Sequence, residues 1–435
     1  MAKNDSSRFE GRALPIVLFT VFLDVLGVGI LLPVLPQLIF KIFEPAGFSL
    51  NGSLIILGWL VGIYPLMQFL ATPILGQLSD RFGRKPILGF SLAGTSVGYI
   101  LFAIAILTKS IPLLFFARAF DGITGGNISV ARAVIADTTP PEHRTRNFGL
   151  MGAAFGFGFV IGPYIGARLA SPNLSFYGLF NTPHWFNTAT PFWFTAILSA
   201  INVMLVMFIL PETNQRIQRA VKIVWTKSLE NIRKAAAAPG LRVIFGSEFL
   251  FWSGFAFFTT FFQIRLIEKL HFTPSNIGDY FAYFGIIMVL VQAVLVPLLA
   301  KRFKNHQILR FSFLGVSAAL FLQLLATNTT QLLLITIFMP IFVGLTIANA
   351  TTLISLSAGK DIQGEVLGIE ASVQALAQSI PAIIAGYIAT LGVNMPVIVA
   401  GSIVFTAGVV FNTFYRPSSH VLHQEGADEL ATAAE

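Results

Sequence analysis

The sequence predicts an all-α membrane protein whose twelve transmembrane helices form two pseudo-symmetric six-helix bundles. Of the 435 residues, 55% are hydrophobic and only 11% are charged, whereas a soluble domain carries about 25% charged residues. The apolar residues gather into twelve runs, and roughly 20 helical residues are enough to cross a bilayer core of about 30 Å. One long polar stretch, 212–242, separates the first six runs from the last six.

The first predicted bundle, 1–211, begins with a polar N-terminus that leads straight into an apolar run. A cleaved signal peptide has a shorter apolar core and a small-residue cleavage site, so we expect this run to be retained as a helix. The six predicted helices of this bundle occupy 14–40, 53–75, 86–107, 111–136, 148–170 and 190–211.

The second predicted bundle, 243–416, is followed by a tail, 417–435. Its six predicted helices occupy 243–265, 276–299, 307–326, 331–356, 365–391 and 393–415.

The distribution of basic residues predicts the orientation. With the N-terminus in the cytoplasm, the cytoplasmic segments hold 21 Lys and Arg and the outer loops hold five, namely Lys41, Lys109, Arg168, Arg265 and Lys269. This bias follows the positive-inside rule. We therefore expect both termini to be cytoplasmic in a plasma membrane, with a bacterial inner membrane favoured. The net charge of +8 then faces the lipid surface, so no nucleic-acid partner is needed to explain it.

The polar stretch 212–242 is predicted to be a cytoplasmic linker. Within it, 228–238 is compatible with a short amphipathic helix on the membrane surface or with a plain solvated connection between bundles. A weak internal repeat supports two homologous halves. The repeat pairs Arg81-Phe82 with Arg302-Phe303, Ile87-Leu88 with Ile308-Leu309, and Gly122 with Gly344.

The segment from Gly76 to Lys85 holds four charges and two glycines between two apolar runs. Such a segment fits a loop on the water side of the membrane, in which a glycine permits a tight turn and an aspartate faces a helix N-terminus. A charge pair here would hold the cytoplasmic side in one state; the alternative is an ordinary basic loop. The candidate cytoplasmic gate consists of Gly76, Asp80, Arg81, Gly83, Arg84 and Lys85.

This segment resembles the signature of the major facilitator superfamily. Asp24-x2-Gly27-x-Gly29-x3-Pro33-x2-Pro36 resembles the first-helix motif of its twelve-helix drug/proton antiporters, and Val134 to Thr139 resembles tetracycline/proton antiporters. The likeness is strong over 14–170 and faint afterwards. Those antiporters have an acid in helix three where this chain has Gly98, and an acid in helix nine where 307–327 has none.

Asp24, Arg118 and Asp121 are the predicted proton-coupling residues. A charge inside a membrane helix costs several kcal/mol and is usually functional, and burial favours the protonated carboxyl. The alternative is a structural role for Asp24 as a partner of Arg118. Arg118 is expected to pair with Asp24 or with Asp121, and the resemblance implies that the helix-four arginine takes part in proton coupling.

The fifth predicted helix carries a glycine motif that resembles the one typical of exporters. Small residues at spacings of four permit close helix packing, and a proline adds a kink. The predicted packing residues are Gly152, Gly156, Gly162, Pro163 and Gly166.

Polar residues inside apolar helices are the candidates for a substrate cavity. Glu370, Gln374 and Gln378 recur at steps of four and form one polar stripe, which fits either a cavity lining or interhelical hydrogen bonds. The other candidate cavity residues are Gln68, Asn127, Glu248, Gln263, Gln292 and Asn349.

Taken together, these features predict a proton-coupled exporter of amphipathic organic compounds, tetracycline-like or multidrug, that works by alternating access. The alternative within the same fold is a transporter of a physiological solute such as a sugar, lipid or metabolite. A membrane enzyme or receptor is the third hypothesis, disfavoured because no metal cluster or catalytic triad spacing is present. We expect a monomer whose partners are the solute, protons and the lipid bilayer, with no cofactor or metal.

Overall fold

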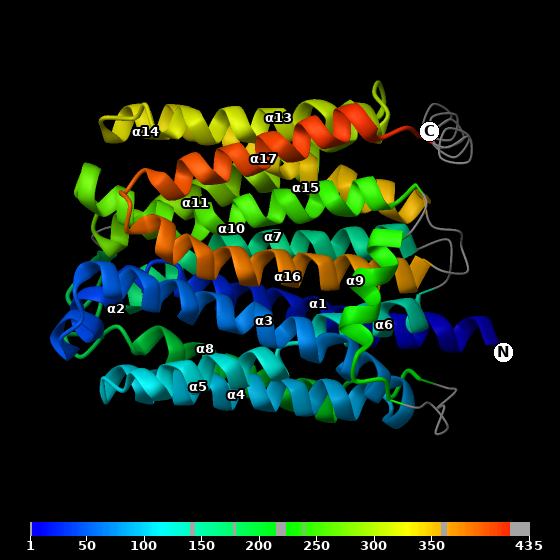
Figure 1. Ribbon diagram of the computed structural model, residues 1–435. Coiled ribbons are helices and arrows are strands. Elements are labelled where there is room, and N and C mark those ends of the chain that lie inside the picture. The colour runs from blue at the N-terminus through cyan, green and yellow to red at the C-terminus, as the bar shows by residue number, and fades with distance from the viewer. Residues whose placement is uncertain are drawn as a thin grey trace. The chain divides into compact units, whose positions relative to one another are not determined.

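Helices make up nearly all of the regular structure in the computed structural model, which describes residues 2–139, 144–176, 180–214, 223–237, 240–357 and 363–417. Within these ranges the only strands are β1 (Ser175–Phe176) and β2 (Phe180–Asn181), which form a small antiparallel hairpin. The predicted all-α class is confirmed (Figure 1).

The chain divides into two compact units. Unit 1 comprises 1–227 and 272–282, and unit 2 comprises 228–271 and 283–435. The elements of unit 1 are α1 (Ala2–Leu31), α2 (Leu35–Leu38), the π-helix η1 (Ile39–Phe43), the 3-10 helix η2 (Glu44–Ala46), α3 (Leu50–Phe82), α4 (Arg84–Leu107), α5 (Ile111–Thr124), α6 (Asn127–Thr138), α7 (Arg144–Leu169) and α8 (Thr190–Phe208).

Unit 2 holds the remaining helices, and α11 begins among the residues of unit 1. Its elements are α9 (Lys227–Ala237), α10 (Arg242–Leu270), α11 (Pro274–Leu290), the π-helix η4 (Val291–Leu295), α12 (Val296–Ala300), α13 (Asn305–Gln323), α14 (Thr329–Thr336), α15 (Phe338–Ser357), α16 (Gln363–Ala389) and α17 (Met395–Phe414).

Each of the twelve predicted runs is helical in the structure. Ten stretches of the described chain are long and apolar enough to cross a membrane. The fourth run falls outside this set because it is broken into α5 and α6, each shorter than a bilayer needs. The ninth run, α13, falls outside it because its first turns contain Asn305, His306, Gln307 and Arg310.

The segment Gly76–Lys85 is not a loop, and this prediction was wrong. The helix α3 continues through Gly76 to Phe82, and α4 begins at Arg84, so Gly83 is the one non-helical residue between them. Gly83 has φ +105°, which a residue with a Cβ seldom adopts. Polar residues continue the helix here because Asp80 and Arg84 form an ion pair across the junction, at 2.6 Å.

The break between α5 and α6 falls at Gly125 and Gly126. These glycines leave the α-helical region with ψ near zero, and they lie close to α3. A Cβ on Gly126 would come within 2.9 Å of the Cα of Thr72, and one on Gly125 within 2.9 Å of the Tyr64 hydroxyl. The missing side chains therefore allow the broken helix to pack against α3.

A glycine stripe brings α7 against α1. A Cβ on Gly158, Gly162 or Gly166 would lie within 2.6–2.7 Å of the carbonyl oxygens of Phe22, Leu26 and Ile30. Such contact requires residues without a side chain. Two residues of this stripe, Gly162 and Gly166, belong to the predicted packing set, and Gly158 is an addition to it.

Gly152 does not belong to this stripe, contrary to the prediction. Nothing lies within 4 Å of a Cβ built on it. Gly152 precedes Gly158 by six residues, which places the two glycines on different faces of the helix. Gly156 is buried but lies two residues from Gly158, which also places it on another face. Pro163 packs beside Gly29 of α1.

Candidate functional site

Asp24 lies on α1 beside the first residue of α6. Its Oδ1 accepts a hydrogen bond of 3.0 Å from Nδ2 of Asn127, whose side chain is fully buried. The other oxygen, Oδ2, is buried and has no hydrogen-bond partner among the described residues. A helix N-terminus favours a nearby negative charge, so the beginning of α6 stabilises one carboxyl oxygen of Asp24. Asn127, which was also predicted for the substrate cavity, thus lies against Asp24.

Arg118 pairs with Asp121, three residues later on α5. The distance from Nη1 to Oδ2 is 3.3 Å, and the two side chains are 8% and 4% exposed. The guanidinium also lies over the ring of Tyr64 on α3, at 4.3 Å from the centroid, a contact worth about 2 kcal/mol when desolvated. Of the two partners that the sequence allowed for Arg118, the structure shows Asp121.

Gly98 on α4 faces this ion pair. A Cβ at this position would lie 2.9 Å from the Cβ of Asp121, so a side chain on α4 and the carboxyl on α5 compete for one space. Position 98 thus has no acid, and the acid in this space is Asp121 on the neighbouring helix α5.

The end of α5 leaves backbone carbonyls that need donors. Gln68 of α3 donates from Nε2 to the Gly125 carbonyl at 2.9 Å, and the Ser91 hydroxyl donates to the Thr124 carbonyl. Gln68, which was predicted to line the substrate cavity, thus satisfies a carbonyl at the end of α5. The break, Asp24 and the Arg118–Asp121 pair together form what we call the buried polar cluster of unit 1.

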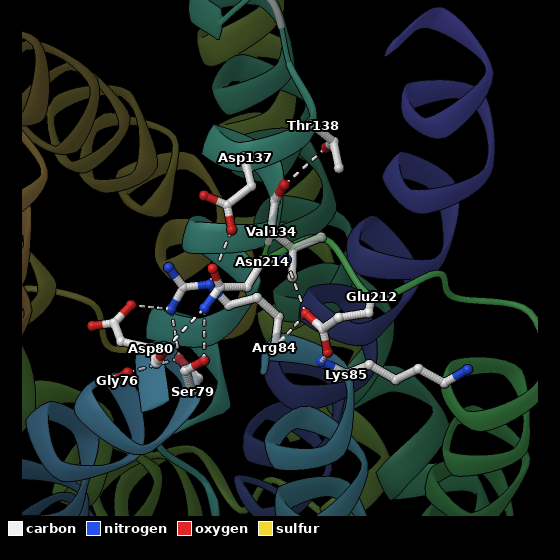
Figure 2. Close-up of polar contacts among 10 residues, drawn as sticks. All are labelled: Gly76, Ser79, Asp80, Arg84, Lys85, Val134, Asp137, Thr138, Glu212 and Asn214. Carbon is white, nitrogen blue, oxygen red and sulfur yellow. Dashed lines mark hydrogen bonds and ion pairs between the residues drawn. The ribbon is translucent and has the colours of Figure 1, made fainter. Parts of the chain in front are cut away.

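A second group of charges, the α3–α4 charge cluster, surrounds Arg84. Figure 2 shows its guanidinium between two carboxylates, with Nη1 at 2.6 Å from Oδ1 of Asp80 and Nε at 3.0 Å from Oδ2 of Asp137. Nη1 also lies 2.7 Å from the Ser79 hydroxyl. The Arg84 side chain is only 12% exposed, so α3, α4 and α6 are joined through one largely buried cation.

Burial raises the pKa of the Asp137 carboxyl above its ordinary value, although the Arg84 guanidinium acts in the opposite direction. As the pH falls, the Asp137 carboxyl is therefore protonated, and its ion pair with Arg84 is lost, at a higher pH than for an ion pair in water.

Glu212, which follows α8, completes this cluster from the other side. Its carboxylate accepts from the backbone N–H of Arg84 at 2.9 Å, of Lys85 at 3.2 Å and of Asn214 at 2.9 Å. It thereby caps the N-terminus of α4. A Cβ on Gly83 would lie 2.4 Å from Oε2 of Glu212, so the glycine makes room for the cap.

The other predicted gate residues have different roles. Arg81 lies over the ring of its neighbour Phe82, at 5.2 Å from the centroid. Lys85 points its side chain away from Asp80 (Figure 2), and Gly76 contributes a carbonyl that accepts the Ser79 hydroxyl at 2.7 Å. The ion pair predicted for Asp80 is made by Arg84.

The predicted cavity residues of unit 2 are buried or partly buried. Oε1 of Glu370 accepts from the Thr351 hydroxyl of α15 at 2.8 Å, and Gln374 and Gln378 follow on α16 with partly buried side chains. Gln263 and Asn349 each donate to a carbonyl four residues earlier on their own helix. Glu248 is 3% exposed on α10, and Gln292 lies partly buried in η4.

Sequence reasoning missed Asp137, Glu212 and Tyr64. Asp137 is 53 residues from Arg84 and Glu212 is 128 residues from it, so neither belongs to a local pattern around Gly83. The one available signal was Asp137 itself, an acid at the end of an apolar run. Within the described part of the chain, no group of three His, Cys, Asp or Glu side chains forms a metal site.

Comparison with known proteins identifies relatives along most of the chain. The model of the Major Facilitator Superfamily matches residues 17–266 and 244–433. The chain is 32% identical over 311 residues to the tetracycline resistance protein, class C, of Escherichia coli, covering 68% of this chain and 70% of the relative. It is 27% identical over 413 residues to multidrug resistance protein 1 of Bacillus subtilis strain 168, covering 94% and 97%.

The fold is similar to that of a solved structure, the human organic anion transporter MFSD10 (TETRAN). The TM-score is 0.71 at 21% sequence identity, and the match covers 92% of this chain and 99% of that one. At this identity the likeness concerns the fold.

Proposed function

The chain belongs to the Major Facilitator Superfamily, and from this membership we propose that it is a proton-coupled exporter of amphipathic organic compounds. Members of the family are multi-pass membrane transporters of small molecules, not enzymes. The names of the relatives, tetracycline resistance and multidrug resistance, support a drug-like cargo, for which we propose outward transport.

The observation that carries the coupling is the division of partners in the buried polar cluster. Two carboxyls, Asp24 and Asp121, share this region with one guanidinium, Arg118, which is paired with Asp121. Asp24 has an amide partner on Oδ1 and an unpartnered buried Oδ2. A buried negative charge without a counter-ion is costly, so binding one proton on Asp24 neutralises the cluster.

The α3–α4 charge cluster supplies the proposed gate. In the proposed orientation, with cytoplasmic termini in a bacterial inner membrane, Arg84 and its partners lie on the cytoplasmic side. Breaking the ion pairs of Arg84 would free α3, α4 and α6 to move in alternating access. The protein is proposed to work as a monomer, and Glu248, Gln292, Glu370, Gln374 and Gln378 remain the proposed contacts for the cargo.

The test is transport in proteoliposomes under an imposed pH gradient, with a panel of drugs and metabolites chosen by a ligand-stabilisation screen. We expect a drug-like hit to be carried at a rate that depends on the gradient. Asp24→Asn should reduce gradient-driven transport to the rate of protein-free vesicles, while the hit still stabilises the variant. Glu44→Gln, which changes an exposed carboxylate of the same unit, should leave transport unchanged.

Unaltered gradient-driven transport by Asp24→Asn would contradict the coupling assignment. Transport of a sugar, lipid or metabolite in place of the drugs would instead favour the physiological-solute alternative, which leaves the role of Asp24 intact.

A further inference from the structure

The helix α9 is attached to unit 2 by one face. Ser228, Asn231 and Ala235 are buried, and they lie on one side of the helix because they are spaced by three and four residues. Nδ2 of Asn231 donates to the Ser372 hydroxyl of α16 at 3.0 Å. Figure 1 shows α9 running across α16 and not along it, so α9 is steeply inclined to the membrane-spanning direction.

A face of α9 that adjoins the buried one is mostly apolar and largely exposed. Leu229, Ile232, Arg233 and Ala236 follow the spacing of an amphipathic stripe, and we call them the outer face of α9. Leu229 is 61% exposed, Arg233 and Ala236 are exposed, and Ile232 is partly buried. Trp225, four residues before Leu229 in the chain, is 73% exposed; tryptophan is enriched at membrane interfaces.

The position of α9 along α16 puts it at one end of a membrane-spanning helix. Ser372, its contact on α16, lies close to the beginning of the candidate span Val366–Ala389. A helix held at that level across a membrane helix lies at the depth of the lipid headgroups, where lipid can reach its exposed side chains.

The charge of the region favours anionic headgroups. The helix carries Lys227, Arg233 and Lys234 against Glu230, and the whole stretch 212–242 holds seven basic residues against two acidic ones. Each Lys or Arg near an anionic membrane surface contributes about 1 kcal/mol of attraction. We propose that the outer face of α9 binds anionic phospholipid headgroups at the membrane surface, with Leu229 inserted and Arg233 paired to phosphate.

This binding can be measured without transport, because the chain contains no cysteine and a single introduced thiol can be labelled. A fluorophore on Leu229→Cys is compared with one on Ala237→Cys, an exposed position outside the outer face. Both proteins are reconstituted in vesicles of phosphatidylcholine and phosphatidylglycerol in equal parts, with either lipid brominated. We expect brominated phosphatidylglycerol to quench the label at 229 strongly, more than brominated phosphatidylcholine does, and to quench the label at 237 weakly.

Adding Arg233→Gln to Leu229→Cys should lower, roughly fivefold, the preference for phosphatidylglycerol over phosphatidylcholine that is measured by quenching of the label at 229. The matched control, Lys109→Gln, removes an exposed basic residue from unit 1 and should leave the preference unchanged. Size-exclusion profiles and melting temperatures of the detergent-purified variants verify that each is folded.

Equal weak quenching at 229 and 237 would overturn the proposal, because the outer face would then lie in water. Equal quenching by the two brominated lipids, unaffected by Arg233→Gln, would also overturn it, because Leu229 would touch lipid without any headgroup selection.

Discussion

At the residue scale, the chemistry of unit 1 depends on which partner each charged group has. Asp121 is held by the Arg118 guanidinium, whereas Asp24 is held by the neutral amide of Asn127. A carboxylate beside a cation has a counter-ion, whereas one beside an amide has only a hydrogen-bond donor. This difference in partners is the basis for proposing Asp24 as the residue that binds the proton.

The same reasoning separates two arginines that lie three residues apart. Arg84→Gln should break the ion pairs with both Asp80 and Asp137, slow transport and lower the free energy of unfolding by about 1 kcal/mol, since both carboxylates are partly solvated. Arg81→Gln should leave transport and melting temperature unchanged, because Arg81 contacts the adjacent Phe82 ring. Transport rates and thermal unfolding of the two variants measure this; equal effects would refute the assignment of the gate to Arg84.

Asp137 gives a prediction about pH. Its folded-state pKa is raised above the ordinary value of 3.8, so between these two values the folded protein binds more protons than the unfolded chain. Stability from this group is then present at low pH and is lost as pH rises through the raised pKa. The wild-type melting temperature minus that of Asp137→Asn should fall with rising pH across this window; a difference that stays flat or rises would show that burial does not dominate at Asp137.

At the element scale, glycines decide where helices touch. The stripe Gly158, Gly162 and Gly166 lets α7 lie against the backbone of α1, and Gly83 lets Glu212 cap α4. These positions differ from Gly152, where a side chain would meet open space. Sequence spacing alone identifies a set of glycines but not which of them lie on the contact face.

The glycine pair Gly162 and Gly152 makes this testable. A methyl group at 162 would lie 2.7 Å from the Leu26 carbonyl and 2.9 Å from the Gly29 Cα, backbone atoms that cannot move without shifting α1. Gly162→Ala should therefore lower stability by about 1–3 kcal/mol, whereas Gly152→Ala should be neutral or slightly stabilising. Thermal unfolding in detergent compares them, and a Gly152 variant as unstable as the Gly162 variant would contradict the contact face.

At the scale of the whole molecule, the sequence predicted the helices well and the contacts poorly, for physical reasons. Apolar runs of membrane length have one stable solution, so the twelve helical segments followed from composition. The charged run after Gly76 looked like a loop because polar residues normally end a membrane helix, yet the Asp80–Arg84 pair lets α3 extend to Phe82. The Arg84–Asp137 and Asp24–Asn127 contacts join residues 53 and 103 positions apart, which no local spacing specifies.

The structure also sharpens the argument for orientation. Arg265, counted among the outer basic residues, is 3% exposed within α10 and donates to Asn394 and to the carbonyls of Leu324 and Ala326. Arg168 is neutralised by Asp279 at 2.7 Å. Fewer free charges therefore face the outer side than the count of five suggested, and the bias toward the cytoplasmic side is stronger.

This bias predicts which ends of the helices face the cytoplasm. Because the chain has no cysteine, Lys109→Cys, between α4 and α5, and Lys304→Cys, between α12 and α13, each provide one reactive thiol at an exposed or partly exposed position. A membrane-impermeant maleimide should label position 109 in intact cells and position 304 only after permeabilisation. The reverse pattern would place the Arg84 cluster outside, where it could not act as a cytoplasmic gate. Labelling of both positions in intact cells would mean that an odd number of the five predicted membrane helices between residues 109 and 304 does not cross the membrane.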